Sequence, residues 1–119
     1  MDAVQSHEAA FELHQQYRFY LLEKGKYECI KHAMEYGEVS VVNLRERLEA
    51  LGILKTEDSS QTWLGSVFGI LARQGVLKAS GRIVTYTVPK RNNHKKTAPV
   101  WILSYGVLLP KDPGIPYIE

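Results

Sequence analysis

The chain has 119 residues, 45% of them hydrophobic and 24% charged, and a net charge of +2, which is ordinary for one globular domain. The sequence has no run of about 18 apolar residues, so we expect no membrane-spanning helix. Its one cysteine, Cys29, excludes an internal disulfide and a cysteine-based zinc site. The first residues do not resemble a signal peptide, so we expect a cytoplasmic protein without metal or other cofactor.

The charges are unevenly distributed along the chain. Residues 1–58 contain eleven acidic side chains and seven lysines and arginines, whereas residues 59–111 contain no acidic side chain and eight lysines and arginines. A segment of this length with only positive charges favours a polyanionic partner. The alternative is a solvated surface that is basic without a binding role.

Residues 1–37 are expected to be helical, because apolar residues recur at helical spacing from about Ser6 to Tyr36. Gly25 interrupts this pattern without shifting its phase, so one long helix and two shorter helices both fit. The segment is rich in tyrosine and phenylalanine, and we expect most of these rings in the core. Aromatic residues on several sides of a helix also suit a homodimer interface. Cys29 is expected to be a small buried residue.

A second helix is expected over residues 41–52, after a short loop or strand at residues 37–39. Ser40 has the short oxygen-bearing side chain preferred at a helix N-cap, and Gly52 suits the residue that ends a helix. One apolar face of this helix is expected to pack on the core, with Val41, Leu44, Leu48 and Leu51.

The third expected helix lies within residues 58–77 and ends near Gly75. Its apolar residues follow the i, i+3, i+4, i+7 pattern and predict one buried face, formed by Leu64, Val67, Phe68 and Leu71. Small and polar residues occupy the other face and would let the helix backbone approach another surface; they are Gln61, Thr62, Gly65, Ser66, Gly69 and Arg73. Trp63, at the edge of the apolar face, fits either the core or a partner contact, and we favour the core.

Two strands are expected at residues 82–88 and 99–105, which are rich in β-branched and aromatic residues. The basic residues 90–98 between them would form a long loop, so the two strands predict a β-hairpin. The tail, residues 106–119, contains three prolines and is expected to be extended, with apolar side chains that pack back on the domain.

This order of elements predicts an α+β, mainly helical protein that contains a winged helix-turn-helix. We expect one domain with an N-terminal helical segment at residues 1–37, a winged helix-turn-helix at residues 38–105 and an extended tail at residues 106–119. In this arrangement the helix at residues 60–75 enters a DNA major groove, and the hairpin loop lies beside it.

Several motifs in the C-terminal half support the same fold. They are a Trp-x-Gly-x-x-Phe pattern in the third helix and a Gly-x-Leu pattern directly after that helix. A basic hairpin tip with a histidine then precedes a strand that contains tryptophan. The residues concerned are Trp63, Gly65, Phe68, Gly75, Leu77, His94 and Trp101. With these motifs, residues 38–103 resemble small winged-helix proteins of bacteriophages and prophages. The resemblance implies binding to double-stranded DNA in transcription control, replication or recombination, and the tyrosine-rich N-terminal third departs from it.

The candidate DNA-contacting residues lie on the third helix and the hairpin. Gln61, Thr62 and Ser66 have side chains that hydrogen-bond base edges, whereas Arg73 and the hairpin cations suit phosphates. A phosphate would also fit the backbone N–H groups at the helix N-terminus. The full set is Ser60, Gln61, Thr62, Ser66, Arg73, Arg82, Lys90, Arg91, His94, Lys95 and Lys96.

The sequence also bears on functions other than DNA binding. A winged helix that docks onto an acidic protein would use the same basic half, with Trp63 or the tyrosine-rich helix as anchors. RNA binding has less support, because no sheet with stacking aromatic residues is visible. We do not expect an enzyme, because the chain has no glycine-rich phosphate loop, no paired acids in its basic half and no histidines at metal-ligand spacing.

Overall fold

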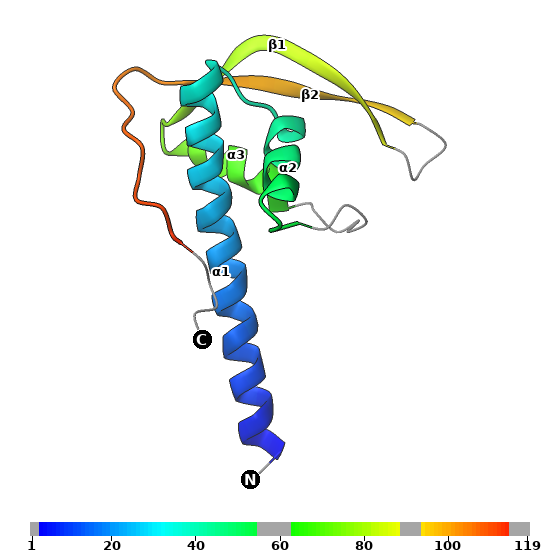
Figure 1. The fold of residues 1–119 in the computed structure, drawn as a ribbon, viewed down its shortest axis with the longest axis vertical. Helices are drawn as coiled ribbons and strands as arrows, with labels where there is room; N and C mark the ends of the chain where they lie inside the picture. Colours follow the sequence, from blue (N-terminus) through cyan, green and yellow to red (C-terminus); the bar gives the residue numbers. More distant parts are fainter. Residues whose placement is uncertain (1–2, 55–62, 89–93, 115–119) are drawn as a thin grey trace.

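The computed structural model describes residues 3–54, 63–88 and 94–114, and the side chains of residues 18–54, 63–86 and 96–114. Helix α1 (Ala3–Tyr36) is one uninterrupted helix of 34 residues, so the two-helix alternative is wrong. Its second half lies against the rest of the protein, and its first half extends away from it (Figure 1). Among the described residues, no helix is both long enough and apolar enough to cross a membrane.

Gly25 lies inside α1, where it leaves space for a neighbouring helix. A Cβ atom at this position would be 3.0 Å from Cζ3 of Trp63 and 3.1 Å from Cγ2 of Val67, both closer than ordinary van der Waals contact. The absence of a side chain therefore lets helix α3 (Trp63–Arg73) pack closely on α1. Trp63 is half-buried and packs against the core, as expected.

Helix α2 (Val41–Ala50) begins with the expected cap. The backbone N–H of Asn43 donates to Oγ of Ser40, and the backbone N–H of Ser40 donates to Oδ1 of Asn43 at 2.9 Å, which forms a capping box. The helix ends at Leu51, and Gly52 follows with a φ of +77°. Leu44 and Leu48 are buried as predicted, but Leu51 is exposed because it lies beyond the last helical turn.

The apolar face of α3 is confirmed, since all four of its predicted members are buried. They join the second half of α1, helix α2 and the first strand in one core, which contains Cys29, Ile30, Ala33, Val39, Leu44, Leu48, Leu54, Leu64, Val67, Phe68, Leu71 and Leu77. Burial raises the pKa of Cys29 to about 12, so its thiol stays protonated at neutral pH, as expected for a small core residue.

Strands β1 (Leu77–Val88) and β2 (His94–Leu103) form an antiparallel hairpin. Leu77 pairs with Leu103 at one end and Val88 with His94 at the other, with an irregular register between Ala79 and Ile83. Val39 makes an isolated antiparallel bridge to Trp101, with backbone hydrogen bonds of 2.8 and 2.9 Å, and so attaches the segment between α1 and α2 to the hairpin.

The hairpin is longer than the sequence predicted, because each strand begins five residues before its expected start. Gly81 has a φ of +87° in the irregular part of β1, where Ser80 Oγ donates to the carbonyl of Val100 at 2.7 Å. The polar residues at 94–97 predict that residues 94–98 belong to the loop, and this prediction is wrong. They are strand residues, since the backbone ladder to β1 does not require apolar side chains.

The prediction that most aromatic residues of α1 are in the core is wrong for two described rings. Phe19 is 66% exposed and Tyr36 is 69% exposed, whereas Tyr27 is buried. Phe19 lies on the part of α1 that leaves the body of the protein, and Tyr36 is at the last turn of α1, where its ring packs on His32 with centroids 4.5 Å apart.

The extended tail runs back along α1 (Figure 1). The hydroxyl of Tyr20 donates to the carbonyl of Gly114 at 2.8 Å, and Lys24 pairs with Asp112 at 2.9 Å. Val107 packs against the core, as expected, while Leu108 is largely exposed.

Replacing Gly25 with leucine is expected to lower the free energy of unfolding by about 1–3 kcal/mol, because the added side chain overpacks the contact with Trp63. The same change at Gly65, a helical glycine with open space around the missing Cβ, is expected to raise it by about 0.5–1 kcal/mol through helix propensity. Urea denaturation followed by circular dichroism measures both. Equal effects of the two changes would contradict the proposed role of Gly25.

Candidate functional site

Helix α3 presents a short polar row on the side opposite its buried face. Ser66, Gly69 and Arg73 follow one another at helical spacing, and the side chains of Ser66 and Arg73 are exposed. The predicted contacts Ser60, Gln61 and Thr62 lie outside the described residues. Of the predicted helix contacts, the structure therefore places Ser66 and Arg73 together on one surface.

The hairpin carries the next group of predicted contacts. Lys96 is exposed on β2, where it pairs with Tyr86 of β1. His94 and Lys95 are also strand residues rather than members of a loop, because they pair with Val88 and Thr87. The predicted contacts Lys90 and Arg91 lie outside the described residues.

Arg82 differs from the other predicted contacts because its charge is already paired. Its guanidinium Nη2 donates to a carboxylate oxygen of Glu38, from the segment between α1 and α2. The two side chains are 61% and 40% exposed, so the pair lies at the surface and contributes little to stability. Sequence reasoning missed this pairing because 44 residues separate the two side chains and only the fold brings them together.

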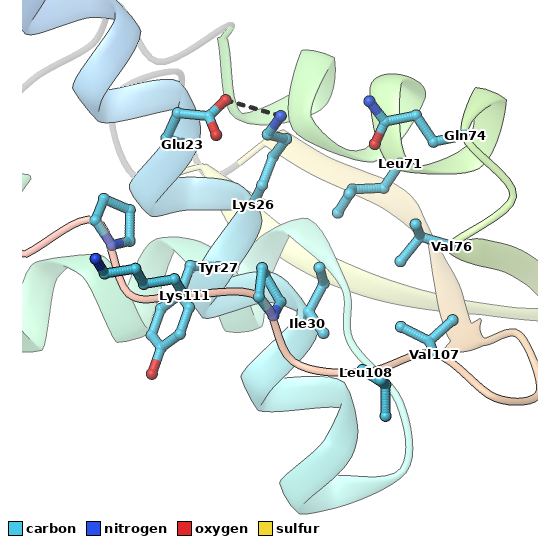
Figure 2. A pocket seen from close by; sticks show the side chains of 12 residues that line it. Glu23, Lys26, Tyr27, Ile30, Leu71, Gln74, Val76, Val107, Leu108 and Lys111 are labelled. Atoms are coloured by element: carbon cyan, nitrogen blue, oxygen red, sulfur yellow. Dashed lines mark ion pairs between the residues drawn. The ribbon is translucent and has the colours of Figure 1, made fainter.

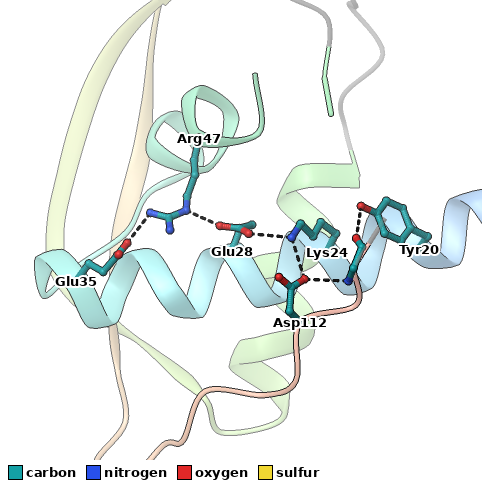
Figure 3. A network of polar contacts seen from close by, with 7 residues as sticks. Tyr20, Lys24, Glu28, Glu35, Arg47 and Asp112 are labelled. Atoms are coloured by element: carbon teal, nitrogen blue, oxygen red, sulfur yellow. Dashed lines mark hydrogen bonds and ion pairs between the residues drawn. The ribbon is translucent and has the colours of Figure 1, made fainter. Parts of the chain in front are cut away.

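The charges of the N-terminal half neutralise one another in a network between α1, α2 and the tail (Figure 3). Nζ of Lys24 lies 3.1 Å from Glu28 and 2.9 Å from Asp112. Arg47 of α2 lies 2.6 Å from Glu28 and 2.8 Å from Glu35. Burial opposes the charged form of Lys24, but the hydrogen bonds to Asp112 and Glu28 outweigh it and raise the pKa of Lys24.

With the exception of Arg82, the described cations of the C-terminal half lack such partners. Within the ranges that the structure describes, four of them have no carboxylate within ion-pair distance: Arg73, Lys78, Lys96 and Lys111. The sequence contains no acidic residue from 59 to 111 that would supply one locally. Positive charge is therefore left uncompensated on the half of the molecule that contains α3 and the hairpin.

An open groove of about 510 Å³ separates α3 from the hairpin. Its walls are mainly apolar, with Gly65, Phe68 and Gly69 on one side and Tyr86, Pro99 and Trp101 on the other. The rings of Phe68 and Trp101 are stacked with centroids 6.2 Å apart. The small residues of α3 are visible in the sequence as one sign of this groove, but the wall from the hairpin depends on a strand register that composition does not reveal.

A second pocket of about 220 Å³ lies where the tail passes α1 and the end of α3 (Figure 2). Its apolar walls include Tyr27, Leu71 and Val107. Glu23 and Lys26 border it and form an ion pair of 2.8 Å. The pocket is thus a mainly apolar seam below the tail, with Lys111 as a further cation in its lining. Across the described ranges, no three histidine, cysteine or acidic side chains lie close enough to hold a metal ion.

Glu28 joins the two basic members of the charge network. Its replacement by alanine is expected to lower the free energy of unfolding by about 2–3 kcal/mol. The loss stays below the roughly 3–5 kcal/mol typical of a fully buried pair, because Lys24 keeps Asp112 and Arg47 keeps Glu35. Asp112→Ala is the control, with an expected loss below about 1 kcal/mol because that pair is half-exposed. Urea denaturation measures both, and an Asp112 effect as large as that of Glu28 would refute this ranking.

Three features adjoin one another on the C-terminal half: the polar row of α3, the unpaired cations and the apolar groove. Gly69 belongs to both the row and the groove, and Lys96 is the cross-strand neighbour of Tyr86 in the groove wall. Comparison of the chain with protein-family models, with curated proteins and with solved structures finds no match. These three features therefore carry the functional inference by themselves.

Proposed function

We propose that this chain is a winged-helix protein that binds double-stranded DNA. The observation that carries the proposal is the uneven pairing of charge: Lys24, Lys26 and Arg47 of α1 and α2 lie in ion pairs, whereas Arg73, Lys78 and Lys96 have no carboxylate partner among the described residues. Unpaired cations spread over one helix and an adjacent hairpin match a phosphate backbone, which binds by electrostatics and counterion release.

The arrangement of elements supports a winged-helix fold. Three helices precede a two-stranded antiparallel hairpin, and Val39, between the first two helices, bridges to the second strand of the hairpin. The hairpin then corresponds to the wing and α3 to the recognition helix.

In the proposed complex the outward row of α3 lies in a major groove. Ser66 is placed to hydrogen-bond a base edge, and Gly69 lets the helix backbone come close to the DNA. Arg73 and Lys96 contact phosphates on either side, and Lys90, Arg91 and Lys95 add charge near the wing tip. A role in phage or mobile-element transcription control, replication or recombination follows from the sequence resemblance and belongs to the same proposal.

Binding to a mixed-sequence duplex, measured by fluorescence anisotropy, is expected to weaken with salt, with a log–log slope of about −3.5 to −5.5 for four to six neutralised phosphates. The double change Arg73→Gln and Lys96→Gln should make this slope shallower by about 1.8. Lys26→Gln with Lys31→Gln removes the same charge from α1 and should leave binding unchanged. No binding at low salt, or equal losses in the two double variants, would overturn the proposal.

Glu38 holds Arg82 of the basic half in an ion pair. Removal of the Glu38 carboxylate should therefore strengthen DNA binding, whereas removal of Arg73 and Lys96 should weaken it. Glu38→Gln is expected to free Arg82 for a phosphate, which should tighten duplex binding and steepen the salt slope by about 0.9. The variant Glu38→Gln with Arg82→Gln should return the slope to the original value. A Glu38→Gln protein that binds no better than the original would show that Arg82 lies outside the DNA interface.

A further inference from the structure

The groove between α3 and the hairpin has a lining that duplex DNA does not explain. Its walls combine the rings of Phe68, Tyr86 and Trp101 with Pro99 and the backbone of Gly65 and Gly69. The volume of about 510 Å³ falls within the roughly 300–1,000 Å³ of typical ligand sites. A duplex presents phosphates and sugars at its surface, whereas a peptide presents the large apolar side chains that fill such a space.

Two glycines of α3 line this groove, and the packing of the protein does not require a glycine at either position. A Cβ at Gly65 or at Gly69 would meet no atom within 4 Å, in contrast to a Cβ at Gly25, which would press on Trp63. Glycine is unfavourable in the interior of a helix. Because nothing in the described structure requires these two glycines, their effect is to keep the groove wide and the α3 backbone accessible.

The charges around the groove indicate what kind of peptide fits it. Arg73 lies one helical turn after Gly69, and Lys96 stands opposite Tyr86 in the strand pairing and next to Thr97 of the groove wall. Both cations lack a carboxylate partner in the described part of the chain. The groove is thus apolar along its walls and positively charged at its borders.

From this complementarity we infer that the groove docks a segment of an acidic partner protein, with an aromatic or large aliphatic side chain in the groove and carboxylates on both sides of it. The buried apolar anchor supplies most of the binding energy, and the contacts to Arg73 and Lys96 fix its position. This inference goes beyond DNA binding and does not require it, because the peptide alone occupies the groove.

The test uses the full chain and fluorescein-labelled peptides of sequence Asp-Asp-Leu-X-Leu-Asp-Asp, in which X is tryptophan, phenylalanine or leucine, in the absence of DNA. At least one peptide is expected to bind saturably. Peptides in which the three central residues are serine, or in which lysine replaces aspartate, should bind at least about tenfold more weakly.

Variants of the protein locate the site. Gly69→Leu fills the groove and should weaken peptide binding by roughly tenfold or more, and Arg73→Gln with Lys96→Gln should weaken it as well. Ala50→Leu adds the same side chain to an exposed position on α2 and is the matched control. Urea denaturation verifies that each variant is folded.

Three results would overturn the inference: no peptide binds, the folded Gly69→Leu protein binds as tightly as the original, or Ala50→Leu weakens binding equally. If no peptide binds and Gly69→Leu instead abolishes duplex binding, the groove belongs to the DNA interface. Loss of peptide binding with intact duplex binding, or the reverse, separates this inference from the proposed function.

Discussion

The burial of one face of α3 determines the position of the candidate functional residues on this helix. Leu64, Val67, Phe68 and Leu71 contribute to the core shared with α1, α2 and the first strand, and that burial fixes the rotation of the helix about its axis. Ser66 and Arg73 are consequently turned outward, and Gly69 faces the groove. Correct packing of the apolar face of such a helix is thus enough to expose its narrow polar face. Gly25 of α1 permits this packing because it leaves space for Trp63 and Val67 of α3.

Much of the fold was predictable because its signals are local. The cap at Ser40, the apolar face of α3 and the helical pattern of α1 depend on residues within a few positions of one another, although the pattern of α1 left one helix and two helices both open. The predicted hairpin boundaries were wrong because pairing with the opposite strand, rather than composition, determines them: residues 94–97 are polar and still form a ladder. The pairing of Arg82 with Glu38 and the groove beside Tyr86 were invisible for the same reason, since each joins segments far apart in sequence.

The proposed DNA interface and the proposed peptide groove share two cations, which couples them. Arg73 and Lys96 border both surfaces, and a carboxylate that occupies them is unavailable to a phosphate. A partner of the inferred chemistry would therefore compete with DNA rather than bind beside it, and the linkage would be reciprocal. Between α1, α2 and the tail, Glu28, Glu35 and Asp112 together offset the charges of Lys24 and Arg47, so that region offers a polyanion much less attraction.

The tail contacts on α1 impose an order on how the chain acquires its structure. The hydrogen bond from Tyr20 to Gly114 spans 94 residues and the bond from Lys24 to Asp112 spans 88, so each closes almost the whole chain into a loop. Such contacts carry a large loop-closure entropy and form after the local helices and the hairpin. During synthesis, Asp112 and Gly114 also leave the ribosome after α3 and the hairpin. In a nascent chain, α3 and the hairpin can therefore form before the contacts between the tail and α1.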